Sequence, residues 1–359
     1  MLVTSLLPMA LGAGTHIAWD VGTRRLVQPG AGYARMARLA DRRLLLTYEQ
    51  AGKIWVRHGT DHDQTWGEPI LVMEIPNATV ANAEILVLRN GSLLSLANER
   101  PLPTAAGKPS RPFRILVSRS KDAGHSWTPP VAVYSGGDRF TDGCWEPAAL
   151  QMPSGMIHLY FANETHFPHS NEQEIEVLRS NDGGVTWSGA ERVCFRARHR
   201  DGMPVPLLLA DGRTIALAIE DDGLSGAFKP VIVTTSDEWR SGAVLGDGPR
   251  RWSALALPLP ETTYAGAPYL CRMADGTIVL SYQESAAGSL EASRMVVCIG
   301  NQQARAFTAR SLPFPDGQPQ LWNALFAKGP KTVTAISTAT IGGRQGIWTV
   351  DGTLRQDER

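Results

Sequence analysis

Two octapeptides sixty residues apart, Ser120-Lys-Asp-Ala-Gly-His-Ser-Trp127 and Ser180-Asn-Asp-Gly-Gly-Val-Thr-Trp187, share the pattern Ser-x-Asp-x-Gly-x-Ser/Thr-Trp. A weaker third copy, in which Asp61 is the matching acid, ends at Trp66, and a truncated fourth runs from Thr235 to Trp239. The tryptophans that end the four copies are 61, 60 and 52 residues apart. Such a near-constant spacing is the signature of a repeat architecture.

A second recurring unit is a pair of short apolar segments joined by a turn dipeptide. The hairpin from Glu84 to Leu96, for example, is centred on Asn90-Gly91. Asn-Gly and Asp-Gly supply the positive φ angles of a two-residue hairpin turn, so we expect that turn type here. The six turns are Asp41-Arg42, Asn90-Gly91, Ser154-Gly155, Asp211-Gly212, Asp275-Gly276 and, in degenerate form, Lys328-Gly329.

In the first four units the hairpin is followed by a further strand that ends in the Asp-containing motif, so each unit reads as four antiparallel strands. An isolated four-stranded sheet would expose both faces, whereas radial stacking of several sheets buries them. The 359 residues accommodate six units, and no helical periodicity competes. The sequence therefore predicts an all-β fold, a six-bladed β-propeller with four antiparallel strands per blade, as one domain over residues 1–359.

The Asp-containing motif itself is interpreted as structural. Its Asp can accept hydrogen bonds from turn amides, its Gly relieves steric strain, and its Trp can pack between adjacent blades. The motif marks the fold and not the functional site.

Composition excludes several classes of partner. The chain has 35 basic and 35 acidic residues, so its formal net charge is zero and no nucleic acid or membrane surface is expected as a partner. No apolar run approaches the roughly 20 residues that span a bilayer. The N-terminus Met1–Gly14 is apolar but lacks a basic region, which makes it a poor signal peptide. We expect neither a metal nor a cofactor, because no motif demands a metal and ligand spacing is lacking at cysteines 144, 194, 271 and 298.

The register of the hairpins brings polar and aromatic residues to one rim. Eight residues before each turn stand Tyr33, Asn82, Glu146, Met203, Ala267 and Leu321, and six before it stand Arg35, Glu84, Ala148, Val205, Tyr269 and Asn323. The partner strands end in Glu49, Asn98-Glu99-Arg100, Asn163-Glu164, Glu220 and Gln283-Glu284. The start of one hairpin strand and the end of the next lie at the same edge, and residues two apart share a face. We therefore expect a carboxylate-rich cleft with aromatic side chains; the alternative is a rim that is polar because it meets water.

Two of these glutamates are the strongest candidates for chemistry. Glu146 lies between Trp145 and Pro147 at the start of an apolar strand, where desolvation would raise its pKa toward general-acid use. Glu220 closes the apolar strand Thr214–Ile219 and precedes Asp221-Asp222, whose charges would also raise its pKa. The Asp221-Asp222 run can equally be a solvated loop.

The repeated Asp-containing motifs on six blades resemble those of the sialidase superfamily. Within it, Cys-Trp-Glu-Pro-Ala-Ala-Leu (144–150), Tyr-Phe-Ala-Asn-Glu (160–164), Arg-Asp-Gly-Met-Pro-Val-Pro (200–206) and Ala-Ile-Glu-Asp (218–221) look like family-93 glycoside hydrolases. These are exo-α-1,5-L-arabinanases that release arabinobiose from linear arabinan. The resemblance implies a retaining enzyme, with Glu146 as acid/base and Glu220 as nucleophile.

Further expectations concern the ligand and the state of the protein. The expected partner is linear arabinan or an arabino-oligosaccharide, and the expected enzyme is a secreted monomer, as many members of the family are secreted. Candidate ligands for sugar hydroxyls are Arg35, Asn82, Glu84, Asn98, Arg100, Asn163 and Asp201. Candidate stacking residues are Tyr33, Trp145, Tyr269 and Trp322.

Two other functions stay open. An exo-α-sialidase would bind its substrate carboxylate with three arginines, of which Arg35 resembles the first. A non-catalytic glycan-binding propeller would have an aromatic cleft without a carboxylate pair at glycosidase spacing.

Overall fold

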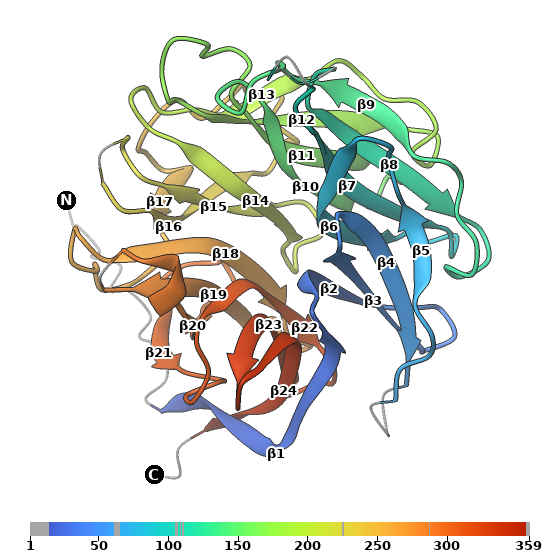
Figure 1. The fold of residues 1–359 in the computed structure, drawn as a ribbon. Coiled ribbons are helices and arrows are strands. Elements are labelled where there is room, and N and C mark those ends of the chain that lie inside the picture. Colours follow the sequence, from blue (N-terminus) through green and yellow to red (C-terminus); the bar gives the residue numbers. More distant parts are fainter. Residues whose placement is uncertain are drawn as a thin grey trace, which may run out of the picture.

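The computed structural model describes residues 14–60, 65–104, 107, 109, 111–224, 226–286 and 288–356. They form six four-stranded antiparallel sheets arranged around a central axis (Figure 1). The predicted all-β, six-bladed propeller is confirmed. Asp61 and the N-terminal stretch up to residue 13 lie outside the described residues.

Five blades follow the chain in order, and their first strands contact one another around the axis. Blades one and two consist of β2 (Gly32–Arg38), β3 (Leu44–Gln50), β4 (Lys53–Gly59), β5 (Ile70–Met73), β6 (Ala78–Val87), β7 (Leu93–Pro101), β8 (Arg114–Ser120) and β9 (Val131–Ser135). Blades three to five consist of β10 (Cys144–Gln151), β11 (Ile157–Asn163), β12 (Glu174–Ser180), β13 (Glu191–Cys194), β14 (Asp201–Leu208), β15 (Ile215–Asp221), β16 (Lys229–Thr235), β17 (Arg251–Ser253), β18 (Tyr264–Arg272), β19 (Ile278–Ser285), β20 (Arg294–Gly300) and β21 (Thr308–Ser311). A short 3₁₀ turn, η1 (Leu290–Ala292), precedes β20.

Blade six closes the ring with both ends of the chain. Its strands β22 (Gln320–Ala327), β23 (Thr332–Ile341) and β24 (Arg344–Gln356) come from the C-terminus, and β1 (Thr15–Pro29) from the N-terminus is its outer strand. β1 pairs antiparallel with β24 from Thr15 opposite Gln356 onward. The β1–β24 ladder thus joins the two chain ends within one sheet.

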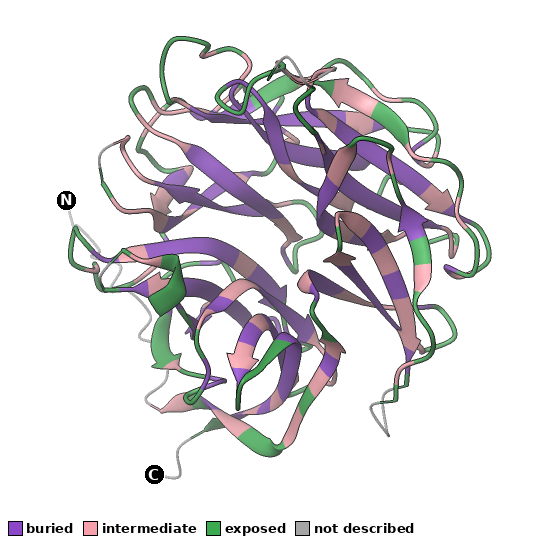
Figure 2. Ribbon diagram, in the orientation of Figure 1, coloured by how far each residue is buried: buried purple, intermediate pink, exposed green. Residues whose placement is uncertain are grey.

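The core is distributed between the blades. Buried residues occupy the inner strands, whereas outer strands such as β9 carry exposed positions (Figure 2). The cluster that holds Leu94 of β7, Tyr160 of β11 and Leu217 of β15 spans three successive blades. Each sheet is therefore stabilised on both faces by its neighbours. Within the described residues, the helical content is one turn, and no helix is long and apolar enough to cross a membrane.

The Asp-containing motif acts as a structural lock, as expected. In the first octapeptide the Asp122 carboxylate accepts hydrogen bonds from the Ser126 amide at 2.9 Å and from the Ser120 hydroxyl at 2.8 Å. In the fourth copy, the Trp239 indole donates to the Tyr160 hydroxyl of blade three at 3.0 Å. The tryptophan of blade four thus packs against the preceding blade.

The predicted turn type is wrong. Leu88 donates to the Ser92 carbonyl at 2.8 Å and Gly91 to the Leu88 carbonyl at 2.9 Å, so the loop has three residues. Gly91 has a φ of 84°, whereas Asn90 uses its side chain to accept from the Ser92 amide. A type I turn followed by a left-handed glycine gives this arrangement.

The register predicted for blade six is displaced by one residue. β22 ends at Ala327, which pairs with Val333, so the turn centre is residue 330 and not 329. The positions that match Tyr33 and Arg35 are therefore Trp322 and Ala324, in place of Leu321 and Asn323. The four cysteines are buried free thiols.

Candidate active site

All six innermost strands carry the same distortion near their start. Each has a register shift against its partner strand, and one non-glycine residue at the shift has a φ between 48° and 56°. These residues are Tyr33, Asn82, Glu146, Met203, Ala267 and Trp322. A non-glycine residue in the left-handed region is uncommon. A β-bulge interrupts the alternation of side chains along a strand and turns one side chain in a new direction. Sixfold repetition indicates that the distortion belongs to the design of the site.

The six bulge residues, one from each innermost strand, make a ring around the central axis, which we call the floor. Tyr33, Met203, Ala267 and Trp322 pack into one apolar cluster, so blades one, four, five and six supply an apolar part. Asn82 of blade two and Glu146 of blade three are polar. The floor is therefore asymmetric, and its polar side faces blades two and three.

Side chains near the ends of the second strands link four of the six bulges to the preceding blade. Bulge amides donate to Glu49 Oε2 (from Asn82, 3.0 Å), Glu220 Oε2 (from Ala267, 2.7 Å), Gln283 Oε1 (from Trp322, 2.8 Å) and Thr338 Oγ1 (from Tyr33, 3.0 Å). In blade three the equivalent residue is Ala162, opposite Trp145. There the Glu146 carboxylate itself accepts from the Met203 amide, at 2.9 Å.

Glu146 and Glu220 flank the Gly202–Met203 peptide. Glu146 Oε2 binds the Met203 amide, and a Cβ placed on Gly202 would lie 3.2 Å from Glu220 Oε1. Gly266 makes room on the other side, because a Cβ there would lie 2.6 Å from Glu220 Oε2. The two glycines leave space for one carboxylate, and main-chain amides fix one oxygen of each glutamate.

The electrostatics of the pair oppose double ionisation. Burial, and then the charge of Glu146, raise the pKa of Glu220 to about 8. Burial also raises the pKa of Glu146, although the amide of Met203 and the guanidinium of Arg100 act in the opposite direction. Two interacting carboxyls titrate as a unit, so ionisation of one opposes ionisation of the other.

Arginines and Glu164 surround the polar side of the floor. Arg100 Nη2 donates to Asn82 Oδ1 at 2.6 Å, and its guanidinium lies 5.3 Å from the Trp145 ring centroid. The Trp145 indole donates to Glu164 Oε2 at 2.8 Å. Glu164 in turn forms an ion pair with Arg200, a contact that orients both.

Arg35 and Glu84 each stand two residues after a bulge residue, Tyr33 and Asn82. Arg35 is 3% exposed, contacts Glu84 at 3.5 Å and donates to the Trp322 carbonyl at 3.1 Å. Its guanidinium lies 4.3 Å from the ring centroid of Tyr33 and 5.0 Å from that of Tyr269. Burial raises the pKa of Glu84. Arg35 thus contacts two residues of the floor, Tyr33 and Trp322.

Three predicted hydroxyl ligands are committed to protein contacts. Asn98 is fully buried and donates to the Cys144 carbonyl at 3.4 Å. Asn163, also fully buried, donates to Tyr134 and Glu176. Asp201 is fully buried too, and both of its oxygens accept from Arg251 at 2.7 Å. The structure therefore buries all three side chains in contacts within the protein.

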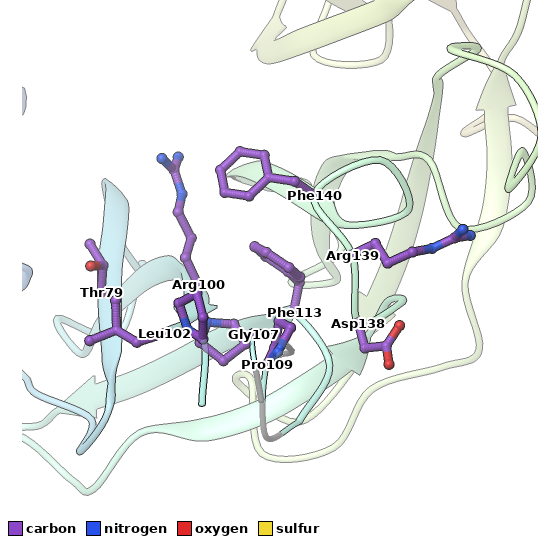
Figure 3. Close-up of a pocket in the computed structure, with 11 residues that line it drawn as sticks. Thr79, Arg100, Leu102, Gly107, Pro109, Phe113, Asp138, Arg139 and Phe140 are labelled. Carbon is purple, nitrogen blue, oxygen red and sulfur yellow. The ribbon is translucent and has the colours of Figure 1, made fainter. Parts of the chain in front are cut away.

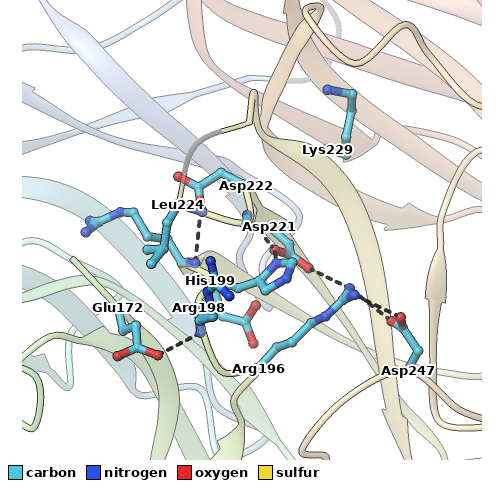
Figure 4. Close-up of polar contacts among 12 residues, drawn as sticks. Glu172, Arg196, Arg198, His199, Asp221, Asp222, Leu224, Lys229 and Asp247 are labelled. Carbon is cyan, nitrogen blue, oxygen red and sulfur yellow. Dashed lines mark hydrogen bonds and ion pairs between the residues drawn. The ribbon is translucent and has the colours of Figure 1, made fainter. Parts of the chain in front are cut away.

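The segment that carries Arg200 is anchored by acidic side chains on both sides (Figure 4). The Arg198 amide donates to Glu172 at 2.7 Å, and the Arg200 amide donates to Asp222 at 3.1 Å. His199 contacts Asp221, which also accepts from Arg251. Asp221 and Asp222, which follow Glu220, thus hold this loop and are not a free solvated run.

Sequence reasoning missed Tyr264, Gly202 and Gly266. The Tyr264 hydroxyl accepts from Gln283 at 2.8 Å, and a Cβ on Gly266 would lie 2.6 Å from its oxygen, as from Glu220. The available signal was a glycine directly before the bulge in blades one, four and five. Among the described residues, His166, Glu174 and Glu176 form a group with metal-ligand spacing, but Glu174 is already paired with Arg192.

Comparison with known proteins agrees with this architecture. Residues 110–245 match the family model described as a BNR repeat-like domain. No curated protein sequence matches the chain. A solved structure of a protein of unknown function from Dyadobacter fermentans has 15% identity and a TM-score of 0.73, over 96% of this chain and 98% of that one.

Two further solved structures have a known enzyme name. The GH93 α-L-arabinofuranosidase of Fusarium graminearum, in complex with arabinobiose, has 18% identity and a TM-score of 0.63, with coverages of 93% and 97%. The NanB sialidase of Streptococcus pneumoniae, as its K499G mutant, has 12% identity and a TM-score of 0.65, with coverages of 93% and 71%. The resemblance predicted from the sequence is thus confirmed for the BNR-type repeats and for the six-bladed fold that these proteins share.

Proposed function

We propose that this protein is a glycoside hydrolase, a retaining exo-α-1,5-L-arabinanase that releases arabinobiose from linear arabinan. The observation that carries the proposal is the pair Glu146 and Glu220, two buried carboxyls that flank one peptide, with the charge of Glu146 raising the pKa of Glu220. Solved structures named as an α-L-arabinofuranosidase and a sialidase have the same fold, which supports a hydrolase.

In the proposed mechanism Glu220, whose protonated form burial favours, passes its proton to Glu146; it then attacks the anomeric carbon as a carboxylate and forms a glycosyl-enzyme. Glu146 gives its proton to the leaving oxygen, then removes a proton from the water that hydrolyses the intermediate. The Ala267 amide holds Glu220 Oε2, which leaves Oε1 for attack. Retention requires a separation of about 5–5.5 Å between the two carboxyl groups.

The arginines favour this reaction over a sialidase reaction. Arg35 is buried and paired with Glu84, while Arg100 and Arg200 are engaged by Asn82 and Glu164. A sialidase needs three arginines directed at one carboxylate. Action on a polymer agrees with secretion, and both secretion and the monomeric state stay predictions.

Single substitutions of the two glutamates test the roles. Glu220→Ala should abolish turnover of both arabinotriose and 4-nitrophenyl arabinobioside, because both need the nucleophile. Glu146→Ala should lower kcat/KM on arabinotriose by about 10²–10⁴. It should slow glycosylation by the nitrophenyl substrate far less, because nitrophenolate leaves without a proton.

Azide added to each variant distinguishes the roles. Glu220→Ala should give a glycosyl azide of inverted configuration, and Glu146→Ala one of retained configuration, as read by NMR. Near-normal activity of either variant on arabinotriose would end the proposal, as would turnover of a sialoside with none of arabinosides.

A further inference from the structure

A pocket of about 600 Å³ opens between blade two and the segment that leads from blade two into blade three (Figure 3). Its lining includes Pro101, Leu102, Pro103, Phe113 and Phe140. Phe140 is 68% exposed and Leu102 is 50% exposed. Large apolar side chains left exposed together, rather than singly, mark a binding surface.

One wall of the pocket is a fixed aromatic group. The ring centroids of Phe113 and Phe140 are 5.4 Å apart at an interplanar angle of 81°, and Trp145 lies 5.0 Å from each. Trp145 is held by its bond to Glu164, and Arg100 covers the Trp145 ring. Phe140 is therefore presented by a supported scaffold, although its own face is open.

Arg100 and Trp145 connect the pocket to the proposed active site: Arg100 lines the pocket and its charge acts on Glu146, and Trp145 contacts the lining residues Phe113 and Phe140. Arg100, which lines the pocket, also donates a hydrogen bond to Asn82 of the floor. Trp145 precedes Glu146 in the chain, whereas Glu220 lies in the next blade. The pocket is thus on the side of the acid, where a glycosidase places the leaving group.

The lining defines the chemistry of the occupant. A sugar needs hydrogen-bond partners for its hydroxyls, but Arg100 is already bonded to Asn82, and Asp138 and Arg139 point away from Phe113 and Phe140 (Figure 3). Arg139 is also paired with Asp142 at 2.7 Å. Apolar walls with a T-shaped aromatic pair suit a flat aromatic ring.

Building on the proposed function, we propose that the leaving-group site binds an aryl alcohol, so that aryl arabinosides are substrates of this enzyme. In the first step the bond from the anomeric carbon to the aryl oxygen breaks as the bond to Glu220 forms. The aryl oxygen receives the proton of Glu146, and water later releases the sugar from Glu220.

The first experiment measures binding of free 4-nitrophenol by equilibrium dialysis, which needs no turnover. Wild type should bind it, and Phe140→Ala should weaken binding about ten-fold because one exposed ring face is lost. Leu257→Ala, which removes a side chain that is 78% exposed outside this pocket, should leave binding unchanged. Absence of binding to wild type, or equal binding by Phe140→Ala, overturns the proposal.

The second experiment compares kcat/KM of wild type and Phe140→Ala on 4-nitrophenyl arabinobioside and arabinotriose. The variant should lose about ten-fold on the aryl substrate and less than about two-fold on the trisaccharide. Equal losses on both would show a sugar site and overturn the proposal. If 4-nitrophenol binds but no arabinoside is hydrolysed, the proposed function fails while the aromatic site stands.

Discussion

At the scale of single residues, the protonation of Glu220 is set by its surroundings. Its carboxylate is enclosed between Gly202 and Gly266, accepts one main-chain hydrogen bond, and lies near the second carboxylate of Glu146. Burial and like charge both favour the protonated form. Enclosing the Glu220 carboxyl must therefore lower the free energy of unfolding once its proton is lost.

This cost predicts a pH dependence of stability. The pKa of Glu220 is about 8 in the folded protein and about 4.5 when unfolded, so the native state binds more protons between these values. The free energy of unfolding should thus fall as pH rises through this window, by roughly 3–5 kcal/mol from this group. In urea unfolding, the difference between the free energies of unfolding of Glu220→Gln and wild type should rise by that amount from pH 5 to pH 8, in favour of the variant.

The exposed Glu68→Gln is the matched control and should follow wild type at every pH. Parallel curves for wild type and Glu220→Gln would contradict the buried, coupled pair.

At the scale of elements, the Asp-containing motif combines a turn with a packing contact. Gly183 and Gly184 in the second octapeptide have φ values of 74° and 81°, so both are in the left-handed region. A Cβ on Gly184 would lie 2.9 Å from a Leu94 methyl in blade two, whereas a Cβ on Gly183 would meet nothing within 4 Å. Gly183 and Gly184 thus share a left-handed backbone conformation, but only Gly184 packs closely against blade two.

The pair separates strain from packing. Gly183→Ala should destabilise the protein by about 1–2 kcal/mol through left-handed strain alone. Gly184→Ala should cost about 1–3 kcal/mol more, because the methyl overpacks the interface with blade two. Thermal and urea unfolding measure both, and kcat/KM should change less than about two-fold. Equal losses of stability would mean that the motif does not connect the blades.

At the scale of the whole molecule, ring closure depends on β1. Gly352 of β24 lies under this strand, since a Cβ there would be 2.5 Å from Ile17 and 2.6 Å from Trp19. β1 pairs with β24 over most of its length, so the N-terminal strand locks blade six to the rest of the ring.

Gly352→Ala should therefore weaken closure. We expect a loss of about 1–3 kcal/mol, because β1 must shift away from β24. Gly343→Ala in the β23–β24 turn has open space and a φ of 73°, so it should cost only about 1–2 kcal/mol from strain. Amide exchange should accelerate in β1 only in the first variant. Unchanged protection of β1 would argue that closure does not depend on this contact.

The fold could be predicted because repetition is visible in the chain. The recurrence of the Asp-containing motif and of the hairpins predicted the number of blades, and strand periodicity placed Glu146 and Glu220 at one rim. The turn type and the register of blade six were wrong, because a degenerate turn such as Lys328–Lys331 has no local signal that fixes its centre.

By itself, the sequence determined the six-bladed ring and the candidate glutamates, since both depend on local patterns of turns and alternation. Only the tertiary structure decided that both oxygens of Asp201 bind Arg251, and that Gly202 and Gly266 enclose Glu220. It also decided that Phe140 joins Trp145 in a wall beside Glu146. These contacts join residues from different blades or loops, and their distances depend on how the ring closes.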